Sequence, residues 1–435
     1  MTPASDVRSG WGERGGRAPR GVARAWVGRA VRTARLTWAA CVVVTALAAC
    51  GGGAQEPASD LVISSDRELR RMAAEILPGL ADRAGLDLVA PVRVERRTRQ
   101  ELEGYLTMKL DEQFPVEDAD ATVRAYALLG LVDEGLDLRS LLLDLYTEQV
   151  AGFYEPDSTA LFVMDDQPRD ALEGLLLHEL VHAVQDQTVD LEAITSRDRG
   201  NDRAAAAHAA IEGHATLVML EFMMERMTGE AVDLAEVPGL AQQLLPALDD
   251  MSAQFPALAG APDIIKRSLL FPYVHGAGFV QELWEMEGRV APFGPYLPTS
   301  TEQVMAGDLE DTPLAVTLKV TGGRVVHSDV LGRLEVEVLV EAHLGAEARS
   351  LAEGWGGDRF ALILPNEVGP EVLVWVSLWD DEASRDEFRR AFEPVLQSLG
   401  PPAALETVAP GGRPGLMLTI GDVNGLRLEP GIGDG

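Results

Sequence analysis

The sequence predicts an α+β protein with two folded parts: a mainly helical domain with a small sheet over residues 61–310, and a small α+β domain over residues 320–409. Two observations support the first part. Long runs such as residues 204–228 have the apolar spacing of helices, and two β-rich runs flank Pro156-Asp157-Ser158. The third observation is a change of pattern at residues 308–323, after which short alternating runs predominate. A chain of 435 residues has room for two or three domains.

Residues 1–50 have the pattern of a bacterial export signal. Arginines precede residues 36–49, an uncharged and largely apolar run that is too short for a membrane span and suits a signal sequence. The run ends in Leu47-Ala48-Ala49-Cys50, which resembles a lipobox in which the Cys50 thiol carries the lipid. The alternative is an uncleaved N-terminal anchor, because the uncharged stretch continues to Gln55. Either way we expect an extracytoplasmic, membrane-anchored bacterial lipoprotein or anchored protein, with residues 51–60 as its tether.

The charge is strongly acidic beyond this segment. Eight of the 37 Lys and Arg residues but only two of the 69 Asp and Glu residues precede Cys50, which leaves 29 basic and 67 acidic residues after it. Such a surface repels phosphate backbones, so we expect no nucleic-acid partner. Cys41 and Cys50 are the only cysteines of the sequence, so a metal site in the mature chain has to use His and carboxylate ligands.

Between the tether and the hairpin the sequence predicts helices and one strand. The first helix covers residues 61–84 and begins near Ser65, with Glu68 as its capping-box partner. Residues 89–97 alternate as in a strand. Further helices are expected at residues 99–114, 118–130 and 138–149, and the hairpin strands at residues 150–154 and 160–163.

Residues 171–187, ALEGLLLHELVHAVQDQ, are the most informative stretch, with His178, Glu179 and His182 in the order H-E-x-x-H. On a helix, residues four apart lie on one face about one turn apart, so the two imidazoles can bind one metal ion. Glu179 then lies beside the metal, where it can take a proton from a water that the metal polarises. The leucines of the stretch give the helix a buried side and make it a rigid mount. The alternative is a helix with two polar positions near a core.

A third ligand is expected on the long helix predicted at residues 204–228, where the candidates are Glu212, His208 and His214. Glu212 is an acid in an Ala-rich, apolar helix, where burial is costly unless a cation pairs with it. Its neighbour Gly213 would let this helix approach the metal helix closely. We therefore expect Glu212 to be the ligand, with His208 and His214 as alternatives.

The segment HELVHAVQD resembles the active-site helix of thermolysin-like gluzincins, whose third ligand is a Glu from a second helix. The resemblance implies a zincin-like fold, zinc bound by His178, His182 and Glu212, and Glu179 as general base. Metzincins are excluded, because the positions of their Gly and third His hold Gln185 and Thr188.

One departure from the thermolysin pattern is Thr216, which stands where those enzymes have an Asp that orients a ligand His. The resemblance is closer to uncharacterised bacterial lipoproteins that pair HELxHAxQDQ with EGxA. In those proteins, segments like Phe271-Pro272-Tyr273, Gly276 and Ser300-Thr301-Glu302-Gln303 follow, so the likeness extends to about residue 305.

Three features near the motif have two interpretations each. In zinc peptidases a strand beside the site commonly binds the substrate as an added strand, and the predicted hairpin is either that element or a structural hairpin. Tyr273 and His275, in a helix expected at residues 264–288, are possible stabilisers of the oxyanion formed during amide hydrolysis. Their alternative is a Tyr in the helical core and an exposed His.

The C-terminal part is predicted from shorter patterns. Residues 334–340 alternate as a strand but also fit a helix, residues 347–354 suggest a helix, and residues 354–358 a turn. Strands are expected at residues 360–364, 372–378 and 416–420, an amphipathic helix at residues 382–399, and a loose tail at residues 410–435. Trp355 and Trp375 are expected in the core of this domain.

These observations predict a zinc-dependent hydrolase, a metallopeptidase of the gluzincin type that cleaves peptide bonds of a protein or peptide substrate at the cell envelope. Zinc would activate water, and Glu179 would pass the proton to the leaving amine. The alternative is a non-catalytic zinc-binding or scaffold lipoprotein. Glu179 argues against that alternative, because a structural zinc site needs no base. Cell-wall peptide cross-links remain open as substrates.

Overall fold

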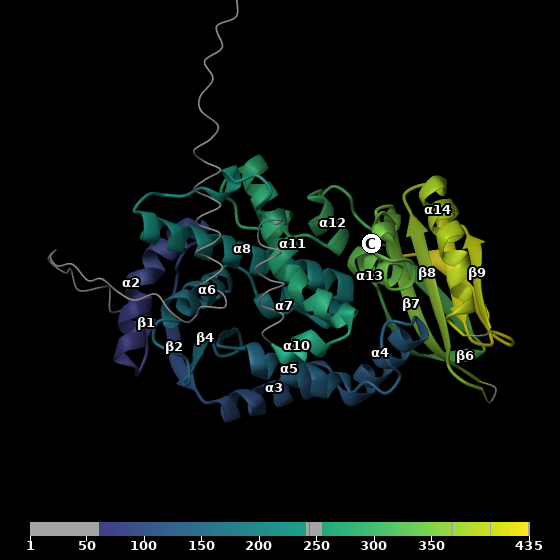
Figure 1. The fold of residues 1–435 in the computed structure, drawn as a ribbon, viewed down its shortest axis with the longest axis horizontal. Helices are drawn as coiled ribbons and strands as arrows, with labels where there is room; N and C mark the ends of the chain where they lie inside the picture. The colour runs from purple at the N-terminus through teal and green to yellow at the C-terminus, as the bar shows by residue number, and fades with distance from the viewer. Residues whose placement is uncertain (1–60, 241–242, 244–254, 367–368, 401, 434–435) are drawn as a thin grey trace, which may run out of the picture.

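The structure is a computed structural model that describes residues 61–240, 243, 255–366, 369–400 and 402–433, and it shows a mixed α+β fold (Figure 1). The predicted signal, the lipobox with Cys50 and the tether lie outside the described residues. Within the described ranges no helix is both long and apolar enough to cross a bilayer.

The first part is built on a four-stranded sheet with the strand order β1-β2-β4-β3. Its strands are β1 (Val62–Ile63), β2 (Val92–Arg97), β4 (Ala160–Met164) and β3 (Gly152–Glu155). The first three run parallel, and β3 pairs with β4 antiparallel through the expected hairpin. The edge beside the motif helix is therefore formed by β3, the one antiparallel strand of this sheet.

Long helices cover this sheet and share one apolar core with it. They are α2 (Arg67–Ala84), α6 (Leu172–Gln185), α8 (Asn201–Thr228) and α11 (Asp263–Glu287). Shorter elements connect them: α7 (Leu191–Thr195), η1 (Arg197–Arg199), η2 (Leu234–Glu236), α10 (Pro256–Gly260), η3 (Gly294–Tyr296) and α12 (Thr301–Ala306). The helices α3 (Arg99–Gln113), α5 (Leu138–Gln149) and α4 (Val116–Leu128) run along one side of the molecule toward the second sheet (Figure 1).

The second part is an antiparallel five-stranded sheet in the order β6-β7-β8-β10-β9. Its strands are β6 (Gly323–Asp329), β7 (Trp355–Pro365), β8 (Val372–Trp379), β10 (Gly415–Ile420) and β9 (Ala403–Val408). The helical elements α13 (Gly332–Leu344), η4 (Ala346–Ala352), α14 (Glu382–Phe392) and η5 (Glu393–Gln397) belong to this part, as does the short turn η6 (Pro410–Gly412). Side chains alternate along β8, so that Trp375 enters the core with α13 and α14 while Val374 enters a core on the opposite face.

The structure corrects several sequence predictions for this part. The tail is not loose, because residues 415–420 form β10 and Arg427–Ile432 form β11. Strand β11 pairs with β5 (Val316–Thr321), which lies within the domain boundary expected at residues 308–323. The expected turn at residues 354–358 is the start of β7. Of the two interpretations of residues 334–340, the helical one is confirmed, since these residues lie in α13, which packs between the two parts with apolar positions at helical spacing.

Two local predictions also change. The first helix is capped by Asp66, whose carboxylate accepts from the backbone N–H groups of Glu68 and Leu69, so Ser65 is not its cap. The two parts are not separate at their cores, because Ala125 and Tyr126 of α4 and Ile264 of α11 lie in the core of the second part. Trp355 and Trp375 are fully buried as expected, and both indole N–H groups donate to Asp358.

Helices α8 and α11 approach each other closely at two glycines. A Cβ atom at Gly213 would lie 2.1 Å from the carbonyl carbon of Gly276, and one at Gly276 would lie 2.1 Å from the Ala209 oxygen. The missing side chain of Gly213 thus allows close contact with α11 and not with the motif helix α6, which corrects the role expected for this residue. Glu212 lies next to this contact, so the crossing fixes its position.

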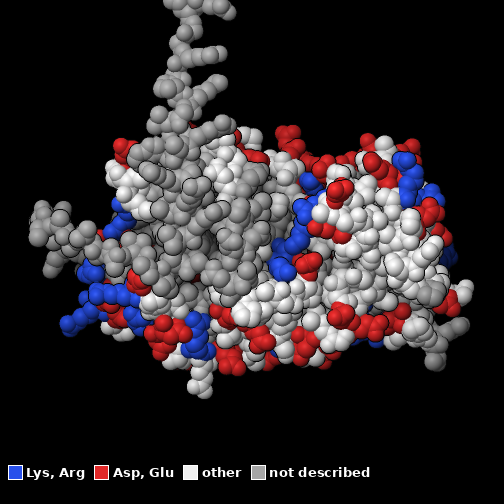
Figure 2. Space-filling model, in the orientation of Figure 1, with Lys and Arg blue, Asp and Glu red and all other residues white. Residues whose placement is uncertain are grey.

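The surface carries the acidic excess that the sequence shows. On the face in Figure 2, Asp and Glu side chains are spread over both parts and along the side formed by α3, α5 and α4. Many of the basic side chains are paired with them, for example Arg267 with Glu337 and Glu341.

Candidate metal centre

Helix α6 presents the motif residues from a buried helix. Leu172, Leu176, Leu177 and Leu180 are at most 1% exposed and fix its orientation against the sheet and α2. His178 and His182 follow each other by one turn, so both imidazoles project from the same face toward α8. The side chain of Glu212 reaches them from α8.

Three donor atoms converge at this point. The Nε2 atoms of His178 and His182 are 3.1 Å apart, and the Oε2 atom of Glu212 lies 3.0 Å from the first and 3.5 Å from the second. Ligands about 2.0–2.1 Å from a tetrahedral zinc ion are roughly 3.3 Å from each other, so the spacing fits one face of a zinc tetrahedron. Among the described residues this is the one group of His, Cys, Asp and Glu that could hold a metal ion.

The electrostatics of the three groups favour a cation. Burial opposes a charge on His182, but the Glu212 carboxylate overcomes this and raises the pKa of His182 to about 9. Burial also acts to raise the pKa of Glu212, yet the imidazoles of His182 and His178 hold that pKa well below its ordinary value. Glu212 is thus a partly buried carboxylate, with a side chain 19% exposed, that two imidazoles face, as the cost of burying an unpaired acid led us to expect.

Glu179 lies beside this triad and is only 8% exposed. Its Oε2 atom accepts a hydrogen bond of 3.1 Å from the backbone N–H of Tyr154 in the edge strand β3. Burial raises the pKa of Glu179 above its ordinary value, although the neighbouring imidazoles oppose this. A carboxylate whose pKa is shifted toward neutrality suits a general base.

Of the two possible oxyanion stabilisers, the structure brings only Tyr273 to the site. Its ring centroid lies 6.4 Å from that of His178. The Glu212 carboxylate, together with burial and Glu179, raises the pKa of Tyr273 well above its ordinary value, so the hydroxyl keeps its proton. His275 lies elsewhere: it stacks on Phe271, and the charges around it are those of Glu337, Arg267 and Arg333. It is therefore not a site residue.

The alternative third ligands are not part of the triad. His208 is exposed one turn before Glu212 on α8 and does not belong to the group of converging ligand atoms. His214 is fully buried, and its two ring nitrogens contact Gln185 Nε2 at 3.0 Å and the Ala84 oxygen at 3.1 Å. Burial lowers the pKa of His214 to about 3, so its ring is neutral.

Sequence reasoning missed Gln185, whose amide oxygen accepts from Nδ1 of His182 at 2.8 Å. The available signal was its position three residues after His182, on the same face of an otherwise apolar helix end.

Asp186, whose role the sequence left open, accepts from the Tyr154 hydroxyl at 2.8 Å and from the Leu191 N–H at 3.2 Å. It thereby ties β3 and α7 to the end of the motif helix. Thr216 is buried, and its hydroxyl makes no hydrogen bond to His178 or His182.

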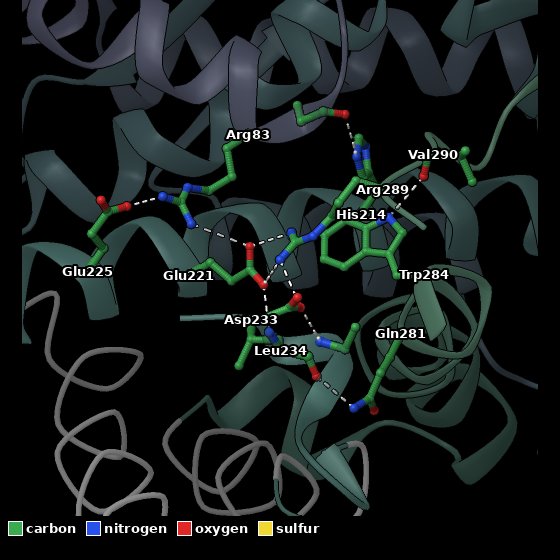
Figure 3. A network of polar contacts seen from close by, with 12 residues as sticks. Arg83, His214, Glu221, Glu225, Asp233, Leu234, Gln281, Trp284, Arg289 and Val290 are labelled. Atoms are coloured by element: carbon green, nitrogen blue, oxygen red, sulfur yellow. Dashed lines mark hydrogen bonds and ion pairs between the residues drawn. The ribbon is translucent and has the colours of Figure 1, made fainter. Parts of the chain in front are cut away.

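A buried ion-pair network anchors α8 in this position (Figure 3). Glu221 is fully buried and accepts from both terminal nitrogens of Arg289 at 2.5 and 2.6 Å, while Arg83 of α2 lies 3.5 Å from it. Arg83 also pairs with Glu225, one turn further along α8. The network holds the end of α2 against α8, which is where the Ala84 carbonyl meets His214.

Comparison with known proteins gives one match. Residues 318–415 match a family described as a domain of unknown function (DUF8575), and this segment runs from β5 to the first residue of β10. It lies in the second part of the chain and contains none of the residues of the metal centre. No curated protein and no solved structure matches the chain.

Proposed function

We propose that this chain is a zinc-dependent hydrolase with a zincin-like catalytic domain, a metallopeptidase of the gluzincin type at the cell envelope. The observation that carries the proposal is the convergence of His178, His182 and Glu212 at the spacing of zinc ligands, with the carboxylate of Glu179 beside them. Three protein ligands leave the fourth position of a tetrahedral ion open, as catalytic zinc sites do.

The chemistry divides between the metal and the chain. Zinc, when bound, supplies a Lewis acid that polarises a carbonyl and lowers the pKa of water. Glu179 is placed to accept a proton from that water and to return it to the leaving amine, while the N–H of Tyr154 holds its carboxylate in position. Tyr273 keeps its proton. Its hydroxyl, which hydrogen-bonds to Glu212 in this structure, would turn to donate to the developing oxyanion once Glu212 is engaged by the metal.

The edge strand supports a peptide as substrate. Met164 donates its N–H to the Ala151 carbonyl, and the alternation of an antiparallel pair then turns the backbone groups of Gly152 and Tyr154 away from β4. The Tyr154 N–H does point outward, because it donates to Glu179. An extended peptide added along β3 would therefore lie directly beside the general base.

The chain would act outside the cytoplasm, held to the membrane by a lipid on Cys50. The support for this part is the apolar run that ends in Leu47-Ala48-Ala49-Cys50 and the small, polar tether after it.

The test compares zinc content and peptide hydrolysis in the full chain and two variants. We expect about one zinc per wild-type chain, loss of zinc in Glu212→Ala, and retained zinc in Glu179→Gln with hydrolysis reduced by about 10²- to 10⁴-fold. Wild type without zinc, or Glu212→Ala that binds zinc as tightly, contradicts the metal site. Zinc without hydrolysis of any peptide or cross-link substrate favours the scaffold alternative.

A further inference from the structure

A chain of buried hydrogen bonds leads from His182 to the end of α2. Nδ1 of His182 contacts the amide oxygen of Gln185 at 2.8 Å, and the amide nitrogen of Gln185 contacts Nδ1 of His214 at 3.0 Å. The same amide nitrogen donates to the Ile211 carbonyl at 3.0 Å, and Nε2 of His214 contacts the Ala84 carbonyl at 3.1 Å. Gln185 and His214 are both 0% exposed.

The backbone carbonyls of Ile211 and Ala84 determine which group donates in each hydrogen bond of this series. A carbonyl oxygen only accepts, so His214 carries its hydrogen on Nε2, which leaves Nδ1 as an acceptor. The Ile211 carbonyl likewise requires the NH₂ side of the Gln185 amide, so the amide oxygen faces His182. In the neutral ring, the form that binds a metal, His182 then donates from Nδ1, and its Nε2 atom carries the lone pair.

We infer that Gln185 is a positioning residue that selects the metal-binding tautomer of His182 and holds its ring toward Glu212. The inference rests on the proposed zinc site. Metal-bound histidines commonly donate their second ring nitrogen to an oxygen acceptor, which fixes the tautomer and the orientation. Here the acceptor is a neutral amide from the same helix, and its own orientation is set by α8 and α2.

The residues packed around His214 hold its ring in one orientation, and this fixes one end of the hydrogen-bond series. Its ring contacts Trp284 and Phe293 edge-on, at centroid distances of 5.9 and 6.1 Å. Figure 3 shows His214 beside Trp284 and Arg289, the residue that pairs with the buried Glu221. The ring therefore cannot turn to exchange its nitrogens without breaking the bond to Ala84.

The first experiment uses chelator competition to compare the zinc affinity of the full-length wild type with that of Gln185→Leu and Gln185→Glu. A positioning role requires an oxygen acceptor, so Gln185→Leu should bind zinc about 10- to 100-fold more weakly. Gln185→Glu, as the neutral acid that keeps an oxygen toward His182 and donates its O–H to the Ile211 carbonyl, should stay within several-fold of wild type. A packing role predicts the reverse order, because Leu suits a fully buried position and a carboxylate does not. Gln187→Leu, two residues on and bound to the Val89–Ala90 backbone, is the matched control that should keep wild-type affinity.

The second experiment reads the two tautomers in the wild-type chain and uses a variant for assignment alone. Nitrogen NMR of the zinc-loaded, ¹⁵N-histidine-labelled wild-type chain should show hydrogen on Nε2 of His214 and on Nδ1 of His182, with His214 assigned through His214→Phe. Hydrogen on Nδ1 of His214, or equal zinc affinity in wild type and Gln185→Leu, overturns the positioning role and leaves the zinc site intact. A wild-type chain that binds no zinc overturns the proposed function itself.

Discussion

The crossing of α8 and α11 offers a sharp test of how the site is held. In Gly213→Ala the new methyl group would lie 2.1 Å from the Gly276 carbonyl carbon, 2.2 Å from its oxygen and 2.7 Å from the Ala277 nitrogen. All three atoms belong to the backbone, so no side chain can turn away. Ordinary contact begins at 3.4 Å, so the helices have to separate by about 1.3 Å.

Two opposing contributions set the size of the effect. Ala in place of Gly favours the helix by about 0.8–1.0 kcal/mol. Overpacking in a core costs about 1–3 kcal/mol and more where the backbone must move. We expect a net loss of about 2 kcal/mol in the free energy of unfolding. Metal–ligand distances tolerate about 0.2 Å, so the displacement of the neighbouring Glu212 should also weaken zinc binding at least about tenfold.

The matched control is Gly174→Ala on the metal-motif helix itself, where a Cβ atom would meet nothing within 4 Å. That variant should gain up to about 1 kcal/mol in the free energy of unfolding and keep wild-type zinc affinity. Urea unfolding with and without zinc, together with chelator competition, measures both quantities. If Gly213→Ala matches Gly174→Ala in both, the two helix backbones do not touch and the reasoning is refuted.

Three further predictions concern the metal, the buried Asp202 in the first turn of α8, and the lipid anchor. Zinc at about 1,000 times its Kd should raise the unfolding free energy of wild type by about 4 kcal/mol in calorimetry and leave Glu212→Ala unchanged, whereas an equal shift in both would place the zinc elsewhere. Burial raises the pKa of Asp202 to about 7, so its contribution to stability is complete below pH 4 and is lost as the pH rises to 7. Denaturation between pH 4 and 8 should accordingly show a flatter profile for Asp202→Asn than for wild type, and parallel profiles would contradict this pKa. Wild type should incorporate labelled fatty acid and Cys50→Ser should not, whereas a wild-type chain without label would favour the uncleaved anchor.

The parts of the metal centre that local helix geometry decides could be predicted from the sequence. The spacing of His178 and His182 is enough to place both on one face of α6. The cost of burying Glu212 in an apolar helix led us to expect a partner for its carboxylate, and the structure shows the two imidazoles facing it. The role of Gln185 could not be predicted in the same way. Its hydrogen bonds depend on His214 and on the carbonyl at the end of α2, and no local pattern states where that carbonyl lies in the fold.

The limits for the fold are of the same kind. Helices with clear periodicity were predicted within a few residues, as for α5, whose bounds Leu138–Gln149 agree with the prediction. The tail was misjudged because β11 contains Pro430 and Gly431, which are poor strand formers, and it is a strand through its pairing with β5. Gly213 was correctly expected at a close contact, but the partner helix α11 lies more than fifty residues away in sequence, so the spacing alone could not name it.

Helix α8 explains why the site depends on contacts so far apart in the sequence. Successive residues on a helix point about 100° apart, so three in a row face most of the circumference. In α8 these three are Glu212, which faces the imidazoles of α6, Gly213, which contacts the backbone of α11, and His214, which bonds to Gln185 and to the end of α2. A shift of α8 against any one neighbour therefore changes the carboxylate, the helix crossing and the His182 acceptor together. For this reason, substitutions at Gly213 and Gln185, neither of which can bind zinc as a ligand, are expected to change zinc affinity.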